Sequence, residues 1–96
     1  MSPALANACQ YRAAEWAHRL HRSLRWLELY CETHDRPTPH QILAGLRCRR
    51  IQQLARAGIP GKIICAEVHL ANLASLCRAL KRDSGQTLRE LRRKSS

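Results

Sequence analysis

The sequence contains no phenylalanine, and its only aromatic residues are two tryptophans and two tyrosines. With so few bulky rings, the hydrophobic core must be built mainly from Leu, Ile, Ala and Cys. No stretch approaches the ~18–20 uninterrupted apolar residues that a membrane-spanning helix requires. The N-terminal residues also lack the basic start and apolar run of a signal peptide. We therefore expect a cytoplasmic protein without a membrane partner.

Acidic residues are also scarce, because 7 Asp and Glu stand against 17 Lys and Arg and give the 96-residue chain a formal net charge of +10. A chain of this length buries only roughly 60–65% of the surface that its unfolded form exposes. That leaves little room for both a deep catalytic pocket and a stable core. We expect neither an enzyme nor a bound cofactor.

The five cysteines are odd in number and widely spaced, and most of them stand among Leu, Ile and Ala. This pattern predicts reduced thiols that pack as small apolar side chains. Cys31 and His34, together with His40 and Cys48, contain the residue types of a zinc site. They lack the paired short spacings of structural zinc sites, however, so no metal is expected. The cysteines are Cys9, Cys31, Cys48, Cys65 and Cys77.

The positive charge is concentrated in the second half of the sequence. Residues 1–46 contain five basic and four acidic residues, whereas residues 47–96 contain twelve basic and three acidic residues, a net charge of +9. Polyanions such as nucleic acids bind surfaces of this kind, because each neutralised phosphate releases condensed counterions. A strongly hydrated, soluble surface is the simpler alternative.

Between Ala4 and Thr33 there is no Gly or Pro, and apolar residues recur every three or four positions. This spacing predicts one long helix, or two helices joined near residues 21–23. Pro37 and Pro39 then interrupt the pattern. We therefore divide the chain into an N-terminal helical segment, 1–36, and a basic segment, 37–96. The helical stripe consists of Leu5, Cys9, Ala13, Trp16, Leu20, Leu24, Leu27 and Cys31.

Four helices are predicted in the basic segment from their capping residues. Thr38, Pro39 and Gln41 form a capping box for a helix that extends to Ala57, with Gly58 as its left-handed end. A short helix should cover 61–68, and Asn72 should cap a helix that ends at Ser84-Gly85. A last helix should cover 88–94. No strand pattern occurs, so we expect an all-α fold, a small helical bundle with a C-terminal helix-turn-helix.

The two helices at 61–68 and 73–84 have the order of a helix-turn-helix, in which the second helix enters the major groove. Six apolar residues, Ile63, Ile64, Val68, Leu73, Leu76 and Leu80, should hold the pair together and against Leu54. An ordinary amphipathic pair with a hydrated basic face is the alternative. We expect Arg78 to contact guanine, Asn72 adenine, and Lys81 and Arg82 phosphates. Further expected DNA-contacting residues are Ser75, Arg47, Arg50, Arg92 and Arg93.

Residues 59–93 resemble the second helix-turn-helix of AraC-type transcription regulators. The positions that match the family pattern are Pro60, Ile64, Arg78, Lys81, Arg82, Asp83, Gly85, Thr87, Glu90 and Arg92. The sequence departs from that pattern at His69-Leu70, where the family usually has Gly-Phe, and at Leu88, where it has Pro. A weaker resemblance exists to the C subunit of the flagellar master activator. The resemblance implies a helix-turn-helix for this third of the chain.

Together these features predict a transcription regulator that binds double-stranded DNA through a recognition helix near residues 72–82. The N-terminal stripe is too long to be covered by one small domain, and the segment contains Trp16, Trp26 and Tyr30, residue types that are enriched at interfaces. We therefore expect a homodimer, or a partner regulator bound to this segment. The alternative function is that of an interaction protein with a helix-turn-helix shape that binds and modulates another regulator.

Overall fold

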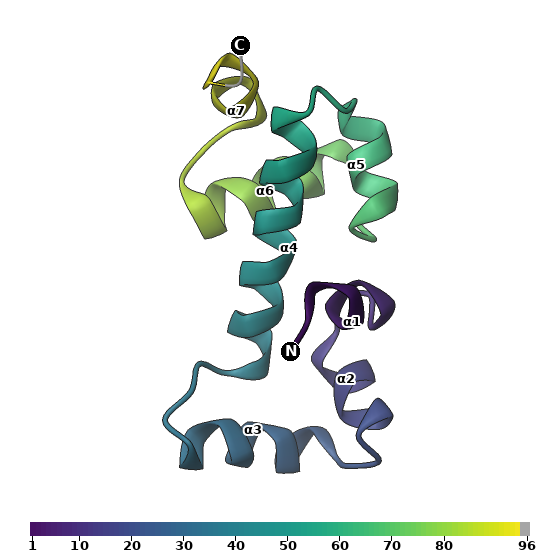
Figure 1. The fold of residues 1–96 in the computed structure, drawn as a ribbon, viewed down its shortest axis with the longest axis vertical. Helices are drawn as coiled ribbons and strands as arrows, with labels where there is room; N and C mark the ends of the chain where they lie inside the picture. Colours follow the sequence, from purple (N-terminus) through teal and green to yellow (C-terminus); the bar gives the residue numbers. More distant parts are fainter. Residues whose placement is uncertain (95–96) are drawn as a thin grey trace. The chain divides into compact units, whose positions relative to one another are not determined.

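The computed structural model describes residues 1–94, and their side chains as far as Arg92. Within this part the chain forms helices and no strands, so the predicted all-α fold is confirmed (Figure 1). The helices are α1 (Pro3–Ala8), α2 (Ala13–Arg19), α3 (Leu24–Thr33), α4 (Pro39–Arg56), α5 (Gly61–Glu67), α6 (Leu73–Ser84) and α7 (Leu88–Lys94).

Contacts divide the chain into two compact units, the first comprising Met1–Leu46 and the second beginning at Arg47. The division lies inside α4, whereas the sequence-based boundary after Arg36 lies in the loop that precedes α4. It coincides with the change in charge, because the nearly neutral half of the sequence ends at the same residue. We refer to the two parts as the neutral unit and the basic unit.

The neutral unit contains three short helices before α4, so the prediction of one long helix or two is wrong. α1 ends where Gln10 and Tyr11 adopt left-handed backbone angles, with φ of 55° and 56°. The amide of Tyr11 donates to the carbonyl of Ala6 at 3.0 Å, which closes the helix. Such angles cost roughly 1–2 kcal/mol per residue, and burial of the Tyr11 ring, only 8% exposed, offsets this cost.

The second break, between α2 and α3, lies in the predicted region. His21 has φ of 55°, and the amide of Arg22 donates to the carbonyl of Ala17 at 3.0 Å. α3 ends in the same way at Asp35, with φ of 53°. In the basic unit, the left-handed residue after α4 is Gly58, as predicted, with φ of 79°. Both units therefore use one kind of helix end; the neutral unit forms it without glycine, and the basic unit uses Gly58 and Gly85 after α4 and α6 but His69, with φ of 59°, after α5.

The predicted helix starts in the second half of the chain are confirmed. The amide of Thr38 donates to Oε1 of Gln41 at 3.0 Å, and the amide of Gln41 donates to Oγ1 of Thr38 at 3.2 Å. These two bonds form a complete capping box at α4. Asn72 caps α6, because its Oδ1 accepts from the amide of Ser75 at 2.9 Å. Thr87 caps α7 in the same way.

Small side chains dominate the core of the neutral unit, where α2 packs against α3. Leu27 and Cys31, on one side of α3, are only 2% and 3% exposed. The predicted stripe is not a continuous outer face, because Leu27 is inside the unit and Leu20 is 43% exposed. The buried residues of this unit are Ala6, Cys9, Tyr11, Ala13, Ala17, Leu27, Cys31, Pro39 and Leu43.

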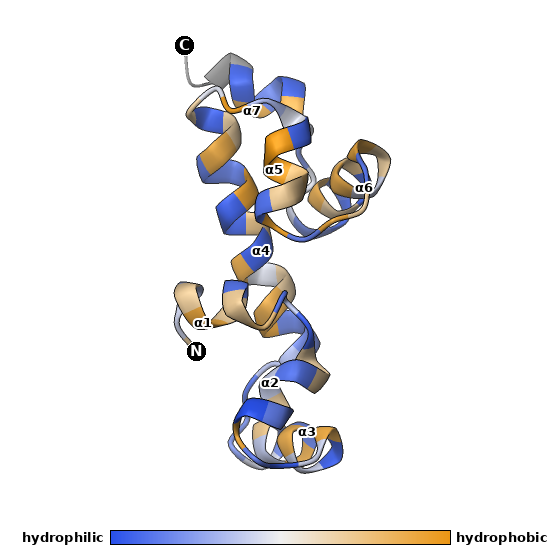
Figure 2. Cartoon of the chain, turned by 90° about the vertical axis from the view of Figure 1, so that its right-hand side faces the viewer, coloured by the Kyte–Doolittle hydropathy of each residue, from blue (hydrophilic) through white to orange (hydrophobic). Residues whose placement is uncertain are grey.

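The basic unit has a core of larger aliphatic residues. Four of the six predicted residues are fully buried, but Ile63 and Leu73 are 56% and 50% exposed, so their prediction was wrong. Ile63 is turned away from the core because its neighbour Ile64 occupies the buried face of α5. Figure 2 shows the hydrophobic segments of α5 and α6 beside hydrophilic ones. The fully buried residues are Ile51, Ala55, Ile64, Val68, Leu76, Leu80 and Leu91.

Leu73 lies over the backbone of Gly61 at the start of α5. A Cβ atom on Gly61 would lie 2.7 Å from Cδ1 of Leu73, which is closer than carbon atoms approach one another. An alanine at this position would therefore require the half-exposed Leu73 side chain to move. The packing of α5 on α6 positions the predicted DNA-binding helix pair.

Candidate nucleic-acid interface

The exposed face of α6 carries two cations and two small residues. Leu76, Ala79 and Leu80 are buried, and the opposite side of the helix presents a different set of side chains to solvent. The residues at the centre of that side are Ala74, Cys77, Arg78 and Lys81, and α6 also exposes Leu73, Arg82 and Asp83. Because Ala and Cys are short, the helix axis can come closer to a partner here than on a face covered by long side chains. We call the four central residues the α6 basic face.

Arg78 and Lys81 differ in what they bind within the chain. Arg78 is exposed and makes no hydrogen bond or ion pair with any of the described residues, so its guanidinium is available to a ligand. Nζ of Lys81 donates to the carbonyl of Gly85 at 3.2 Å, as cations near helix C-termini often do. That bond is exposed, and a phosphate can replace it at little cost.

Arg82 is partly neutralised by its neighbour Asp83. Its Nε lies 3.1 Å from Oδ1 of Asp83, and this hydrogen bond and the carboxylate charge raise the pKa of the guanidinium. Because the Arg82 side chain is 69% exposed, the pair contributes little to stability. The same carboxylate reduces the local positive potential, so Arg82 is a weaker phosphate ligand than Arg78 or Lys81.

Asn72 and Ser75 form the N-terminal cap of α6. Recognition of adenine by Asn requires both the carbonyl oxygen and the amide group of the side chain. The Oδ1 atom of Asn72 already accepts the amide of Ser75, so an adenine contact would cost the helix its cap. The capping hydrogen bond therefore explains why an asparagine stands at this position.

Two of the predicted cations outside α6, Arg50 and Arg92, bind other elements of the unit. Nη2 of Arg50 lies 3.0 Å from Oε1 of Glu67 and thereby links α4 to α5. Nη2 of Arg92 donates to the carbonyl of Ile59 at 2.8 Å and thereby links α7 to the turn after α4. Arg47 is half-buried, and the side chain of Arg93 lies outside the described residues. The contacts of Arg50 and Arg92 hold the unit together, whereas Arg78 on α6 has no such contact.

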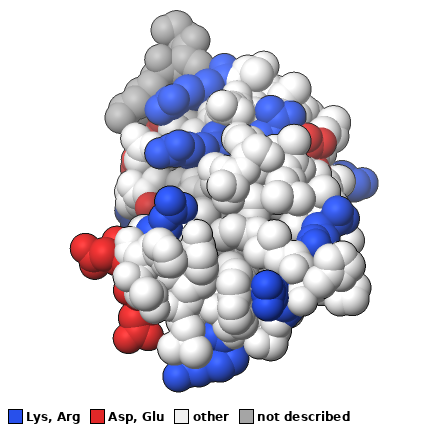
Figure 3. Space-filling model, turned by 60° about the horizontal axis from the view of Figure 1, so that its bottom comes forward, with Lys and Arg blue, Asp and Glu red and all other residues white. Residues whose placement is uncertain are grey.

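Four exposed cations of the basic unit were not singled out from the sequence. Two of them belong to α4, one to α5 and one to α7, and they have no common sequence motif. Only the regional excess of positive charge indicated them, and Figure 3 shows Lys and Arg spread over the visible surface. These residues are Arg49, Arg56, Lys62 and Arg89.

A shallow cavity of about 430 Å³ lies where α5 and α6 meet. Most of the residues that line it are apolar, and Leu73 is the most prominent of them. Ile63, next in the chain to one lining residue, is also largely exposed. The basic unit therefore presents an apolar surface as well as a basic one. The lining residues are Lys62, Cys65, Ala66, Leu70, Ala71, Asn72 and Leu73.

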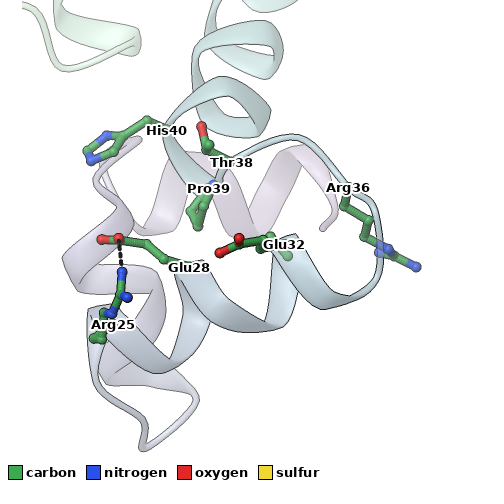
Figure 4. Close-up of a pocket in the computed structure, with 8 residues that line it drawn as sticks. Arg25, Glu28, Glu32, Arg36, Thr38, Pro39 and His40 are labelled. Atoms are coloured by element: carbon green, nitrogen blue, oxygen red, sulfur yellow. Dashed lines mark ion pairs between the residues drawn. The ribbon is translucent and has the colours of Figure 1, made fainter.

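A second cavity, of about 390 Å³, lies in the neutral unit between α3 and the start of α4. Figure 4 shows Arg25, Glu28 and Glu32 along one side of α3, with Arg36 pointing away from the others. Arg25 and Glu28 form an ion pair at 3.7 Å. Charges of both signs therefore line this cavity. Among the described residues, no group of three or more His, Cys, Asp or Glu is arranged to hold a metal ion.

The cysteines form no disulfide, and four of the five are buried. Burial raises the pKa of the Cys9, Cys48 and Cys65 thiols. Because the thiolate is the reactive form of cysteine, a raised pKa makes these side chains poor nucleophiles. Cys77, on the α6 basic face, is the exposed exception.

Comparison with protein-family models, curated proteins and solved structures finds no match to this chain. The resemblance of residues 59–93 to AraC-type regulators therefore stays a prediction. None of the described helices is long and apolar enough to cross a membrane.

Proposed function

We propose that this chain is a transcription regulator that binds double-stranded DNA with α5 and α6 as a helix-turn-helix. The α6 basic face is the observation that carries the proposal. Arg78 has the free guanidinium needed for bidentate contact with a guanine edge, and Lys81 is one helical turn further along the same face. Ala74 and Cys77 leave room for close approach and can contact thymine methyl groups.

The charge of the basic unit supports the proposal from a second direction. Its net charge of +9 favours binding to any duplex, independent of sequence. Arg50, Arg82 and Arg92 have partners inside the chain, so the exposed remainder supplies the phosphate contacts. Each phosphate contact contributes about −0.9 to the slope of log K against log salt.

Selection from a random duplex library with the full chain tests the proposal, followed by titration of the selected and a scrambled duplex. We expect the selected duplex to bind at least about tenfold more tightly than the scrambled one, because one or two base contacts provide 1–3 kcal/mol each. Affinity should fall steeply between about 50 and 200 mM salt. Equal binding of the two duplexes would contradict base-specific recognition.

The apolar surface at Ile63 and Leu73 favours the second candidate, a protein that binds and modulates another regulator. Side chains with half their surface exposed beside a cavity are typical of protein contacts and contribute little to phosphate binding. Under this alternative the selection yields no preferred duplex. Replacing Ile63 by Ser should then abolish binding to the partner regulator while leaving the weak, salt-sensitive DNA binding unchanged.

A further inference from the structure

α3 has apolar residues on two sides. Leu27 and Cys31 lie in the core of the neutral unit, and Trp26, Leu29 and Tyr30 are 37%, 43% and 41% exposed on the other side. An ordinary surface helix has one apolar side and one polar side. The outer side of α3 therefore has the composition of a contact surface. We call Trp26, Leu29 and Tyr30 the α3 outer face.

The side chains along this face are stacked on one another. The guanidinium carbon of Arg22 lies 4.9 Å from the centre of the Trp26 ring, and Trp26 and Tyr30 stack at 5.3 Å. Tyr30 in turn stacks on His34 at 4.1 Å. Side chains ordered in this way lose little rotamer freedom when a partner covers them. The α3 outer face is therefore preorganised for association.

The charges along α3 run against the helix dipole. Arg22 and Arg25 lie at its N-terminal end, and Glu32 and Asp35 lie at or just beyond its C-terminal end. Within a single helix this order is unfavourable, because the N-terminus carries partial positive charge. A second α3 in the opposite direction would place its acidic end beside the basic end of the first. The charge order is thus complementary to an antiparallel copy of itself.

One register pairs the charges within the helix. When the two helices are centred on residues 28 and 29, Arg25 faces Glu32 of the second copy, and Arg22 and Asp35, which lie just outside the two ends of α3, fall at the same ends of the pair. A two-fold axis perpendicular to the helices keeps each flank on its own side. Arg25 and Glu32 do lie along one side of α3 (Figure 4). A parallel pair would instead bring Arg25 against Arg25.

We infer that α3 packs antiparallel against α3 of a second copy of this chain, with the α3 outer face at the interface. Leu27 of the predicted stripe lies in the core, whereas Trp26 and Tyr30, which the sequence also indicated as interface residue types, lie on this surface. The exposed part of three to four side chains per copy falls well below the ~1,200 Å² of a standard interface. We therefore expect a weak dimer that dissociates reversibly.

Sedimentation equilibrium of the full chain, from low to several hundred micromolar, tests this inference. We expect reversible monomer–dimer exchange. Arg25→Glu and Glu32→Arg should each weaken dimerisation by roughly tenfold, because two symmetric pairs become repulsive. The double variant should restore dimerisation. Glu15→Arg, the same charge change at an exposed position of α2, serves as the matched control and should leave the dimer unchanged.

Circular dichroism of each variant separates loss of dimerisation from loss of helix. A wild-type chain that stays monomeric at several hundred micromolar would overturn the inference. A dimer that the double charge swap does not rescue would overturn the antiparallel register. Neither result depends on DNA binding, so failure here is distinguishable from failure of the proposed function.

Discussion

The two units of this chain use their surfaces differently. The neutral unit is held together by Ala, Cys and one buried Leu on α3, and it exposes Trp26 and Tyr30. The basic unit is held together by Ile, Val and Leu and exposes cations. A small chain cannot bury all its apolar side chains, so the location of the exposed ones indicates where partners could bind. These exposed apolar side chains lie on α3 in the neutral unit and beside α6 in the basic unit.

The largest expected effect comes from the core of the basic unit. Leu76→Ala removes a fully buried side chain and should lower the free energy of unfolding by about 2–5 kcal/mol. The matched change in the neutral unit is Leu27→Ala. Urea denaturation, followed by circular dichroism and by Trp fluorescence, will show whether each change shifts one transition or both. Identical shifts in both signals would mean that the two units unfold together.

Arg78→Ala tests the difference in DNA binding between the units. This substitution should weaken the free energy of binding to the selected duplex by about 1–3 kcal/mol and reduce discrimination against other sequences. Arg12→Ala, an exposed arginine of the neutral unit, is the control and should change little. Fluorescence anisotropy measures both affinities. Unchanged discrimination in Arg78→Ala would remove α6 from the recognition role.

A smaller effect is expected at the helix end formed by Gln10. Because Gln10 has φ of 55°, glycine relieves the backbone cost there, and Gln10→Gly should raise the free energy of unfolding by up to about 1 kcal/mol. The opposite change, Gly58→Ala at φ of 79°, should lower the free energy of unfolding by a similar amount. Urea midpoints measure both. Opposite signs for the two changes would support a backbone cost for side chains at these left-handed helix ends.

The smallest effect is expected from Cys77→Ser. Cys77 is exposed, so the free energy of unfolding should change by less than about 0.5 kcal/mol. Cys65→Ser buries a hydroxyl where a thiol packed and should destabilise more. In the wild type, a thiol reagent at mildly alkaline pH should label Cys77 first, because burial raises the pKa of the Cys65 thiol. Equal labelling rates would contradict the described burial.

Local chemistry explains which parts of the fold could be predicted. The capping boxes and the glycines at 58 and 85 act within four or five residues, so helices α4 to α7 could be placed from sequence. The break at Gln10 and Tyr11 could not, because neither residue type signals a left-handed angle. The energetic cost of these left-handed angles is offset by burial of the Tyr11 ring, and that burial depends on the tertiary fold.

The candidate site was predicted only in part for the same reason. Arg78 and Lys81 follow from the helical spacing of α6, which is local. The partners of Arg50 and Arg92 lie far away in sequence, at Glu67 and Ile59. Sequence alone shows how many cations a segment contains, but only the fold shows which of them are already neutralised or bound.

Gly45 in α4 stands next to the residue where the two units divide. Space around its missing Cβ is open, so no packing contact requires glycine at this position. In an exposed helix interior glycine costs about 1 kcal/mol relative to alanine. The turn around Gly45 should therefore open more readily than the next interior turn of α4, and its amide protons should exchange before those around Ile51. The helix that connects the two units thus has its weakest interior propensity close to the point where they divide.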